Sequence, residues 1–362
     1  MSEVKNKRIG EMELWRFIFS VIIVFHHSRR LVGNENALFF NGAYAVEFFF
    51  ILSGYLLMQS IDRVKSSTGS IGKDTFLFIK KKYLSLCPDL FISWILGAAV
   101  TIGACGYTFI EAGNFLAGGI WEMGLLHMGG LNPQGLNSAV WYLSSMLIAM
   151  AILYPILRKY KDGGRLVAIP LAVLLLFGYL YAEFGSLRVP FGWTGWTFRG
   201  NLRAIADLGL GVICYGATQR FAALPLNHFA KGLLTVAKYG CYAALIAYMY
   251  GKQSNVMDFF LLLVIMLAIL LTFSRQTLGQ QIFNNKFIAF LGKYSLPLYL
   301  SHYWWVKVLK IWLPGSMSAM EKTIVYMAMA LASGGLVMAL SALWKKLRPA
   351  RLLKQCFYLK EV

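Results

Sequence analysis

Apolar residues in this chain are gathered into long runs that shorter polar segments separate. A helix needs about 20 apolar residues to cross the hydrocarbon core of a bilayer. Runs of this kind predict spans near 12–31, 42–61, 84–103, 139–157, 166–182, 203–219, 233–250, 256–274, 287–312 and 323–344. We therefore predict an all-α fold, a polytopic bundle of about ten transmembrane helices.

Composition and charge support this class and add an orientation. Of the 362 residues, 58% are apolar and only 14% are charged, whereas soluble domains carry about 25% charged residues. With the N-terminus inside, 24 of the 35 Lys and Arg lie in inward segments and 6 in outward segments. Cytoplasmic loops carry such an excess. Both termini are therefore predicted to be cytoplasmic, and the net charge of +19 needs no nucleic-acid partner.

The chain is expected to form one domain. We predict a transmembrane domain over residues 1–346 and a short cytoplasmic tail over 347–362. A basic leader precedes the first span, as in a signal peptide, but Arg16 and two histidines inside the span predict that it is retained. Five scattered cysteines without a CxxC pair indicate neither a disulfide framework nor a metal site. The sequence carries no signal for an oligomeric state.

The first run, LWRFIFSVIIVFHHS, carries charge where charge is expensive. Arg16 and His27 are eleven residues apart, which is almost three helical turns, so both lie on one helix face about 16 Å apart along the axis. His26 falls roughly a quarter-turn away. With the predicted orientation, this face presents a fixed cation near the cytoplasmic side and a titratable imidazole near the outer side.

Other polar and aromatic residues reach a similar depth from other spans. Glu47 starts the second span from the outer side, Trp141 and Tyr142 start the fourth, and His302 lies past the midpoint of the ninth. These features are predicted to meet His27 in the outer half of the bundle. Arg16 instead lies at the level of the basic cytoplasmic segment.

Each candidate residue has a chemical and a structural interpretation. His27 suits proton abstraction or nucleophilic attack, or is a structural histidine at the interface. Glu47, among apolar neighbours, must pair or protonate; it either holds a ring nitrogen of His27 or pairs with Arg29 or Arg30. Arg16 has the geometry for a phosphate or a carbonyl oxygen, or reaches cytoplasmic water.

The remaining candidates are more ambiguous. His302 is either a second site histidine or an interhelical hydrogen-bond partner. Ser53, beside Gly54, suits helix packing, and Arg203 with Asp207 has the spacing of a structural ion pair. The outer segment 103–139 has no Lys or Arg and either lines a sugar pocket or forms a surface loop.

Five segments of the chain are distinctive as a set. They are LWRFIFSVIIVFHHS, VEFFFILSGYLL, KKKYLSLCP, AVWYLSSMLIAMAILYPIL and LGKYSLPLYLSHYW. Together they resemble the motifs of the acyltransferase 3 family of bacterial membrane acyltransferases. That family has a basic residue, ten residues and a histidine in its first helix, which selects Arg16 and His27 here. Its acidic residue before FFxLSG falls on Glu47, and the serine of LSG falls on Ser53.

One motif departs from the family pattern. The family's RxxR before a proline falls on Lys82 and Ser85, so the first basic residue is kept as lysine and the second is lost. Arg63, Lys80 and Lys81 are the alternatives for contacts with the donor.

The resemblance implies an O-acyltransferase of the bacterial cytoplasmic membrane. Its co-substrate is an acyl-CoA, most often acetyl-CoA, its acceptor is an extracytoplasmic carbohydrate, and no metal is predicted. The CoA phosphates would meet Arg16, Lys82 and Arg63, and the thioester would reach His27, with Glu47 as its partner. The residues expected on the acceptor side are Trp141, Tyr142, His302 and Ser53. His27 either deprotonates the acceptor hydroxyl or accepts the acyl group itself.

Two other functions compete with this one. A transporter of a small metabolite or glycan intermediate would also place charges inside the membrane, although the paired broken helices and repeated halves of many transporters are not evident. A non-catalytic membrane module that serves a partner enzyme is the third interpretation.

Overall fold

The structure, a computed structural model, describes residues 9–64, 69–131, 135–186, 190–251 and 258–347. Within these ranges the secondary structure is helical, with one isolated bridge between Trp193 and Phe198 and no strand. Six helical stretches are long and apolar enough to cross a membrane: Gly42–Arg63, Ile71–Cys105, Ser138–Tyr160, Gly164–Phe184, His228–Tyr250 and Ala319–Leu347. The all-helical prediction is confirmed, and the chain is a multi-pass membrane protein.

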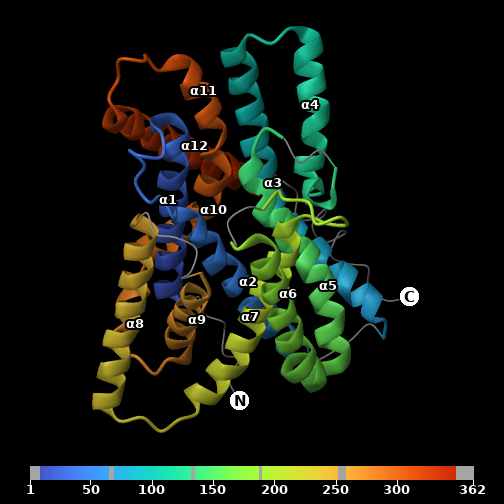
Figure 1. Cartoon of the computed structure of the whole chain (residues 1–362), viewed down its shortest axis with the longest axis vertical. Coiled ribbons are helices and arrows are strands. Elements are labelled where there is room, and N and C mark those ends of the chain that lie inside the picture. The colour runs from blue at the N-terminus through green and yellow to red at the C-terminus, as the bar shows by residue number, and fades with distance from the viewer. Residues whose placement is uncertain (1–8, 65–68, 132–134, 187–189, 252–257, 348–362) are drawn as a thin grey trace.

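The helices are joined by connections that differ in length. In chain order they are α1 (Gly10–Val32), α2 (Ala45–Arg63), α3 (Ile71–Cys105), α4 (Phe109–Met123), α5 (Trp141–Gly163), α6 (Ile169–Phe184), α7 (Arg199–Ala222), α8 (His228–Tyr250), α9 (Asp258–Ser274), α10 (Lys286–Ser301), α11 (Trp304–Trp312) and α12 (Ala319–Leu347). Helices α4 and α11 lie at the upper end in Figure 1, and α8 and α9 reach toward the lower end. Helices α1 and α7 carry charged residues that lower their mean hydropathy, so the count of about ten spans stays a prediction.

The predicted ninth span is wrong as a single helix, because 287–312 divides between α10 and α11. The carbonyl of Leu300, in the last turn of α10, accepts a hydrogen bond from Ser93 Oγ at 2.8 Å and from Asn137 Nδ2 at 2.5 Å. Carbonyls at a helix end need such partners when the helix stops inside protein. Side chains from two other segments therefore stabilise the break, which falls at His302.

The outer segment 103–139 contains a helix that we did not predict. Thr108 begins α4 with a capping box: its Oγ1 accepts from Glu111 N at 3.3 Å, and Glu111 Oε2 accepts from Thr108 N at 2.8 Å. The spacing T-x-x-E is the sequence signature of such a start. Neither interpretation of this segment, a sugar pocket or a surface loop, included the helix.

Helices α2 and α7 pack with their backbones close together. A Cβ on Gly54 would lie 2.0 Å from the carbonyl oxygen of Leu208, and one on Gly211 would lie 2.1 Å from that of Ile51. Small residues permit such approaches between membrane helices. The approach brings Glu47 of α2 against Arg203 of α7.

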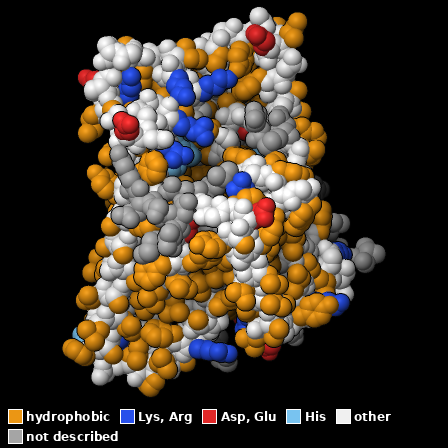
Figure 2. Space-filling view, viewed as in Figure 1, with side chains coloured by type: hydrophobic (Ala, Val, Ile, Leu, Met, Phe, Trp, Pro, Cys, Tyr) orange, Lys and Arg blue, Asp and Glu red, His pale blue; other side chains and the backbone are white. Residues whose placement is uncertain are grey.

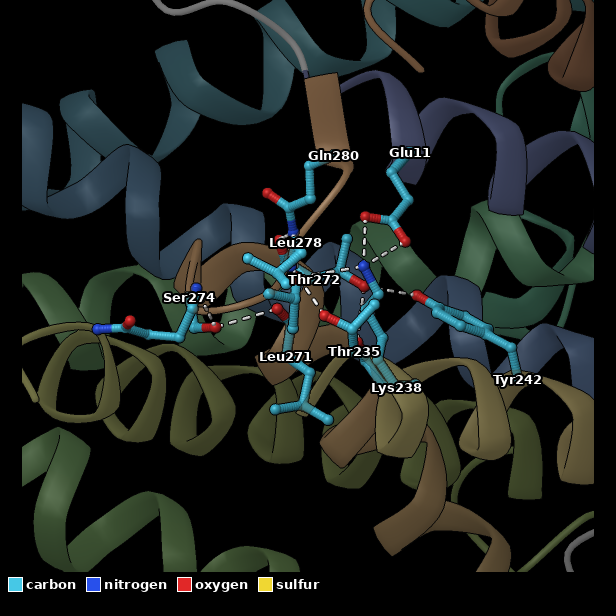
Figure 3. Close-up of polar contacts among 12 residues, drawn as sticks. Glu11, Thr235, Lys238, Tyr242, Leu271, Thr272, Ser274, Leu278 and Gln280 are labelled. Carbon is cyan, nitrogen blue, oxygen red and sulfur yellow. Dashed lines mark hydrogen bonds and ion pairs between the residues drawn. The ribbon is translucent and has the colours of Figure 1, made fainter. Parts of the chain in front are cut away.

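The lower end of α1 is fixed by a buried ion pair with α8 (Figure 3). Both Glu11 and Lys238 are fully buried, and Lys238 Nζ lies 2.6 Å and 2.8 Å from the two carboxylate oxygens. The ammonium also donates to Thr277 Oγ1 at 3.2 Å. One turn further along α1, Trp15 stacks on Tyr242 with ring centroids 3.6 Å apart. These contacts set the position of the helix that carries Arg16 and His27.

Replacing only Lys238 should therefore destabilise the bundle. Lys238→Met leaves Glu11 buried without a counter-charge, which costs about 3–5 kcal/mol. We expect a clear loss of thermal stability in detergent. Size-exclusion chromatography after heating measures the fraction of protein that stays folded. The double variant Glu11→Gln/Lys238→Met should recover most of the loss, and Lys231→Met on the same helix should have little effect. Equal stability of Lys238→Met and wild type would contradict this role.

Candidate functional site

Four cavities adjoin one another along the bundle. The lower cavity, about 450 Å³, is lined by residues that include Asp74, Lys81, Lys82 and Ser85. The arginine cavity, about 230 Å³, is lined by residues that include Arg16, Ser53, Lys82 and Tyr142. The histidine cavity, about 260 Å³, is lined by residues that include His26, His27, Trp141 and Arg203. The upper cavity, about 560 Å³, is lined by residues that include Arg30, Tyr303, Lys307 and Lys310.

Shared lining residues establish the order of these cavities. Lys82 lines both the lower and the arginine cavity. Val46 and Tyr299 line both the arginine and the histidine cavity, so these two lie back to back. Arg30 and Tyr303 line both the histidine and the upper cavity. The result is a series of spaces from one end of the bundle toward the other.

Helix α1 runs beside the two middle cavities. It is continuous from Gly10 to Val32, and it presents Arg16 to the arginine cavity and His27 to the adjacent histidine cavity. The prediction that these residues share a helix face is thereby confirmed. Arg16 Nη1 also lies 2.9 Å from Glu13 Oε2, a partner one turn earlier, and its side chain keeps 31% of its surface exposed.

His27 belongs to a pair of histidines. Its ring stacks on that of His302 with centroids 5.1 Å apart and meets Tyr303 edge-on at 5.0 Å. His302 is fully buried, and its Nδ1 lies 2.6 Å from the carbonyl oxygen of Tyr299. A carbonyl only accepts, so Nδ1 of His302 carries the proton. Within the described part of the chain, His27 Nδ1 and His302 Nε2 are buried without a hydrogen-bond partner.

The expected contact between Glu47 and His27 is not formed. Glu47 is fully buried and pairs with Arg203, whose Nε lies 3.8 Å from Asp207 Oδ2. The expectation failed because α7 packs closely on α2 and supplies a cation that the sequence order did not place there. The Arg203–Asp207 pair is confirmed. Arg203 also lies over the Trp141 ring at 5.4 Å, and both residues line the histidine cavity. Glu47 therefore affects this cavity indirectly, through its ion pair with Arg203.

The arginine cavity collects most of the other predicted residues. Ser53 Oγ lies 3.2 Å from Tyr142 Oη, which also donates to the carbonyl oxygen of Phe49 at 3.2 Å. Tyr142 therefore faces a different cavity from its neighbour Trp141.

Of the predicted donor-binding residues, only some gather at this cavity. Lys82 lies at the junction of the lower and arginine cavities. Ser85, at the position of the family's second arginine, donates its hydroxyl to the carbonyl oxygen of Lys82 at 2.6 Å. Arg63 is exposed at the end of α2 and lines none of the four cavities.

Sequence reasoning missed Tyr299 as a site residue. Tyr299 lines both middle cavities, and its hydroxyl donates to the carbonyl oxygen of Ala139. Tyr299 lies three residues before His302, which directly follows α10; residues three apart lie on one side of a helical turn, which was a usable signal. His26, assigned to another face, also borders the histidine cavity, and its Nδ1 donates to the carbonyl oxygen of Phe39 at 3.2 Å.

Glu122 joins the outer segment to the helices behind the site. Its carboxylate accepts from Asn137 N at 2.8 Å and from Trp94 Nε1 at 3.2 Å. Asn137 in turn holds the carbonyl of Leu300, two residues before His302. Helix α4 is not among the helices that are long and apolar enough to span a membrane, and burial raises the pKa of the Glu122 carboxyl to about 7.

A family model described as an acyltransferase domain, that of the acyltransferase 3 family, matches residues 9–343. Neither the curated proteins nor the solved structures gave a match. Among the described residues, no group of three or more His, Cys, Asp or Glu side chains is arranged to hold a metal ion.

The packing of the outer segment should depend on pH through Glu122. The folded carboxyl has a pKa of about 7, above its ordinary value near 4.5, so the folded state binds the proton more tightly and loses stability as pH rises from about 4.5 to 7. We expect the opening free energy of this segment to fall by about 2 kcal/mol over that range. Hydrogen exchange of the amides in 119–140, corrected for the pH dependence of the intrinsic exchange rate, measures this opening free energy.

The isosteric variant provides the control. Glu122→Gln keeps an oxygen for Asn137 but has no titrating proton, so its opening free energy should be flat over the same range. His127 should not interfere, because burial lowers its pKa to about 4 and it stays neutral above that pH. The same pH dependence in both proteins would rule out Glu122 as its source.

Proposed function

Because the chain belongs to the acyltransferase 3 family, we propose that it moves an acyl group, in the simplest case acetyl, from cytoplasmic acyl-CoA to a hydroxyl of an extracytoplasmic carbohydrate. One observation carries the proposal. Arg16 and His27 lie on one face of α1 and line two back-to-back cavities, and further cavities adjoin these on either side.

The orientation inferred from Lys and Arg makes the lower cavity cytoplasmic. Lys81 and Lys82 then meet the CoA phosphates together with Arg16, as cations bind phosphate oxygens through charge-assisted hydrogen bonds. Half-exposed Arg16 keeps donor hydrogens available despite its contact with Glu13. The acyl end of the donor would pass between Val46 and Tyr299 toward His27.

His27 would supply the acid–base chemistry on the far side of this junction. In direct transfer, the acceptor hydroxyl gives its proton to His27 while its oxygen attacks the thioester carbonyl. The C–S bond then breaks, and the departing CoA thiolate takes the proton from His27. In the two-step alternative, a ring nitrogen of His27 first attacks the thioester carbonyl, and CoA leaves as the thiol with the ring proton. The acceptor hydroxyl then attacks the acyl-imidazole, and its proton goes to the ring nitrogen that leaves. The unpartnered Nδ1 atom gives His27 a ring nitrogen for either route.

Two neighbours would prepare His27 for this role. His302 stacks behind it, with its own proton fixed on Nδ1 by the carbonyl of Tyr299. Glu47 acts as a positioning residue, because it holds Arg203 against Trp141 at the wall of the same cavity.

Removal of the imidazole should abolish transfer. In vesicles given labelled acetyl-CoA, His27→Ala should lower acetyl transfer by at least about a hundredfold. His228→Ala, at the exposed start of α8, is the matched control and should behave as wild type. Full transfer by His27→Ala would refute the catalytic role, and solute uptake without acetylation by wild type would favour transport.

Replacement of Arg16 should instead weaken binding of the acyl-CoA donor. For Arg16→Ala, we expect the KM for acetyl-CoA to rise roughly tenfold while kcat changes less, because one charge-assisted contact contributes about 1.4 kcal/mol. Arg165→Ala removes a partly buried arginine that pairs with Asp162 and lines none of the four cavities, and it serves as control. An unchanged KM in Arg16→Ala would contradict phosphate binding by this residue.

A further inference from the structure

The upper cavity is lined by a set of cations. Arg30 of α1 and Lys307 and Lys310 of α11 are exposed and line this space of about 560 Å³. Figure 2 shows Lys and Arg side chains gathered in the upper half of the molecule, with a His side chain beside them. Among the described residues, no Asp or Glu lines the upper cavity or the histidine cavity.

Cations are scarce at the end of the bundle predicted to face outward. The outward segments hold only 6 of the 35 Lys and Arg, and topology disfavours basic residues there. Lys307 and Lys310 reach this end because α10 stops at Ser301 and α11 emerges beyond it. Their convergence with Arg30 on one cavity therefore needs a reason other than topology.

Neutral aromatic groups contact two of these cations, Lys307 and Arg30. Lys307 Nζ donates to Tyr107 Oη and lies 5.6 Å from the centre of the Phe115 ring. Arg30 lies over the Tyr303 ring at 5.3 Å, and that ring meets His27 edge-on. In the described part of the chain, neither lysine nor Arg30 has an acidic partner within ion-pair distance. The cavity thus keeps an uncompensated positive charge beside the histidine.

We propose that the upper cavity selects an anionic acceptor, a carbohydrate that carries a carboxylate or phosphate group near the hydroxyl to be acylated. This inference rests on the proposed function, because it uses His27 as the reacting group. The anion would lie against Lys307 and Lys310, and the sugar would reach the histidine cavity past Tyr303, which lines both spaces. The rings of Phe191 and Phe198 offer flat apolar surface for the sugar.

Binding of matched oligosaccharides tests this assignment. Three fluorescent probes serve in neutral detergent: a galacturonic acid trimer, its carboxyl-reduced neutral form, and a trisaccharide with one phosphate monoester. Wild type should bind at least one anionic probe about tenfold more tightly than the neutral one. The difference should shrink with added salt, because exposed charges are screened. Carboxylate and phosphate probes together distinguish the two sources of negative charge.

Variants of the two lysines test whether the anionic probes bind in the upper cavity. The double variant Lys307→Gln/Lys310→Gln should weaken binding of the anionic probe roughly tenfold, since two partly exposed ion pairs are lost. Its binding of the neutral probe should be unchanged. Lys322→Gln removes a partly buried lysine at the start of α12 that does not line the cavity, and it should have no effect. The KM for acetyl-CoA should stay within about twofold of wild type in both variants.

The contrary outcomes are distinct. Equal binding of the anionic and neutral probes, or no effect of the double variant, would overturn the inference. A raised KM for acetyl-CoA in the double variant would instead show that these lysines take part in donor binding. Competition by phosphatidylglycerol vesicles, but not by phosphatidylcholine vesicles, would assign them to lipid headgroups. Labelled acetyl transfer that depends on His27, measured in the same preparations, shows separately whether the proposed function holds.

Discussion

A charge inside this bundle must be neutralised by another side chain, and the placement of the helices around the site follows from that constraint. Glu11 and Lys238 fix the lower end of α1 against α8. Glu47, Arg203 and Asp207 join α2 to α7 where glycines let the backbones approach. Arg203 of the second network lines the histidine cavity, and Glu11 and Lys238 of the first are fully buried. They therefore hold the walls against which Arg16 and His27 are presented.

The site is divided into two halves by packing. Val46 and Tyr299 lie between a space bordered by Arg16 and Lys82 and a space bordered by His27. A division of this kind suits a reaction whose substrates approach from opposite faces of a membrane, because neither aqueous side then opens directly to the other. The cations of the upper cavity extend the same series of spaces with a second region of positive charge.

Much of the local organisation followed from simple periodicity. The eleven-residue spacing of Arg16 and His27 gave their shared face, because a continuous helix has a fixed number of residues per turn. The break at His302 did not follow from the apolar run, since it depends on Ser93 and Asn137, which approach from distant segments. Helix α4 was missed although its capping box was present in the sequence.

By itself, the sequence determined the helical membrane class and the two residues that α1 presents, because these depend on composition and on the geometry of one helix. Only the tertiary structure decided the partners. Glu47 meets Arg203 instead of His27, and His27 meets His302, since a buried charge or ring takes whichever neighbour the packing supplies. Which cavity each side chain lines was decided in the same way, by contacts between helices far apart in the chain.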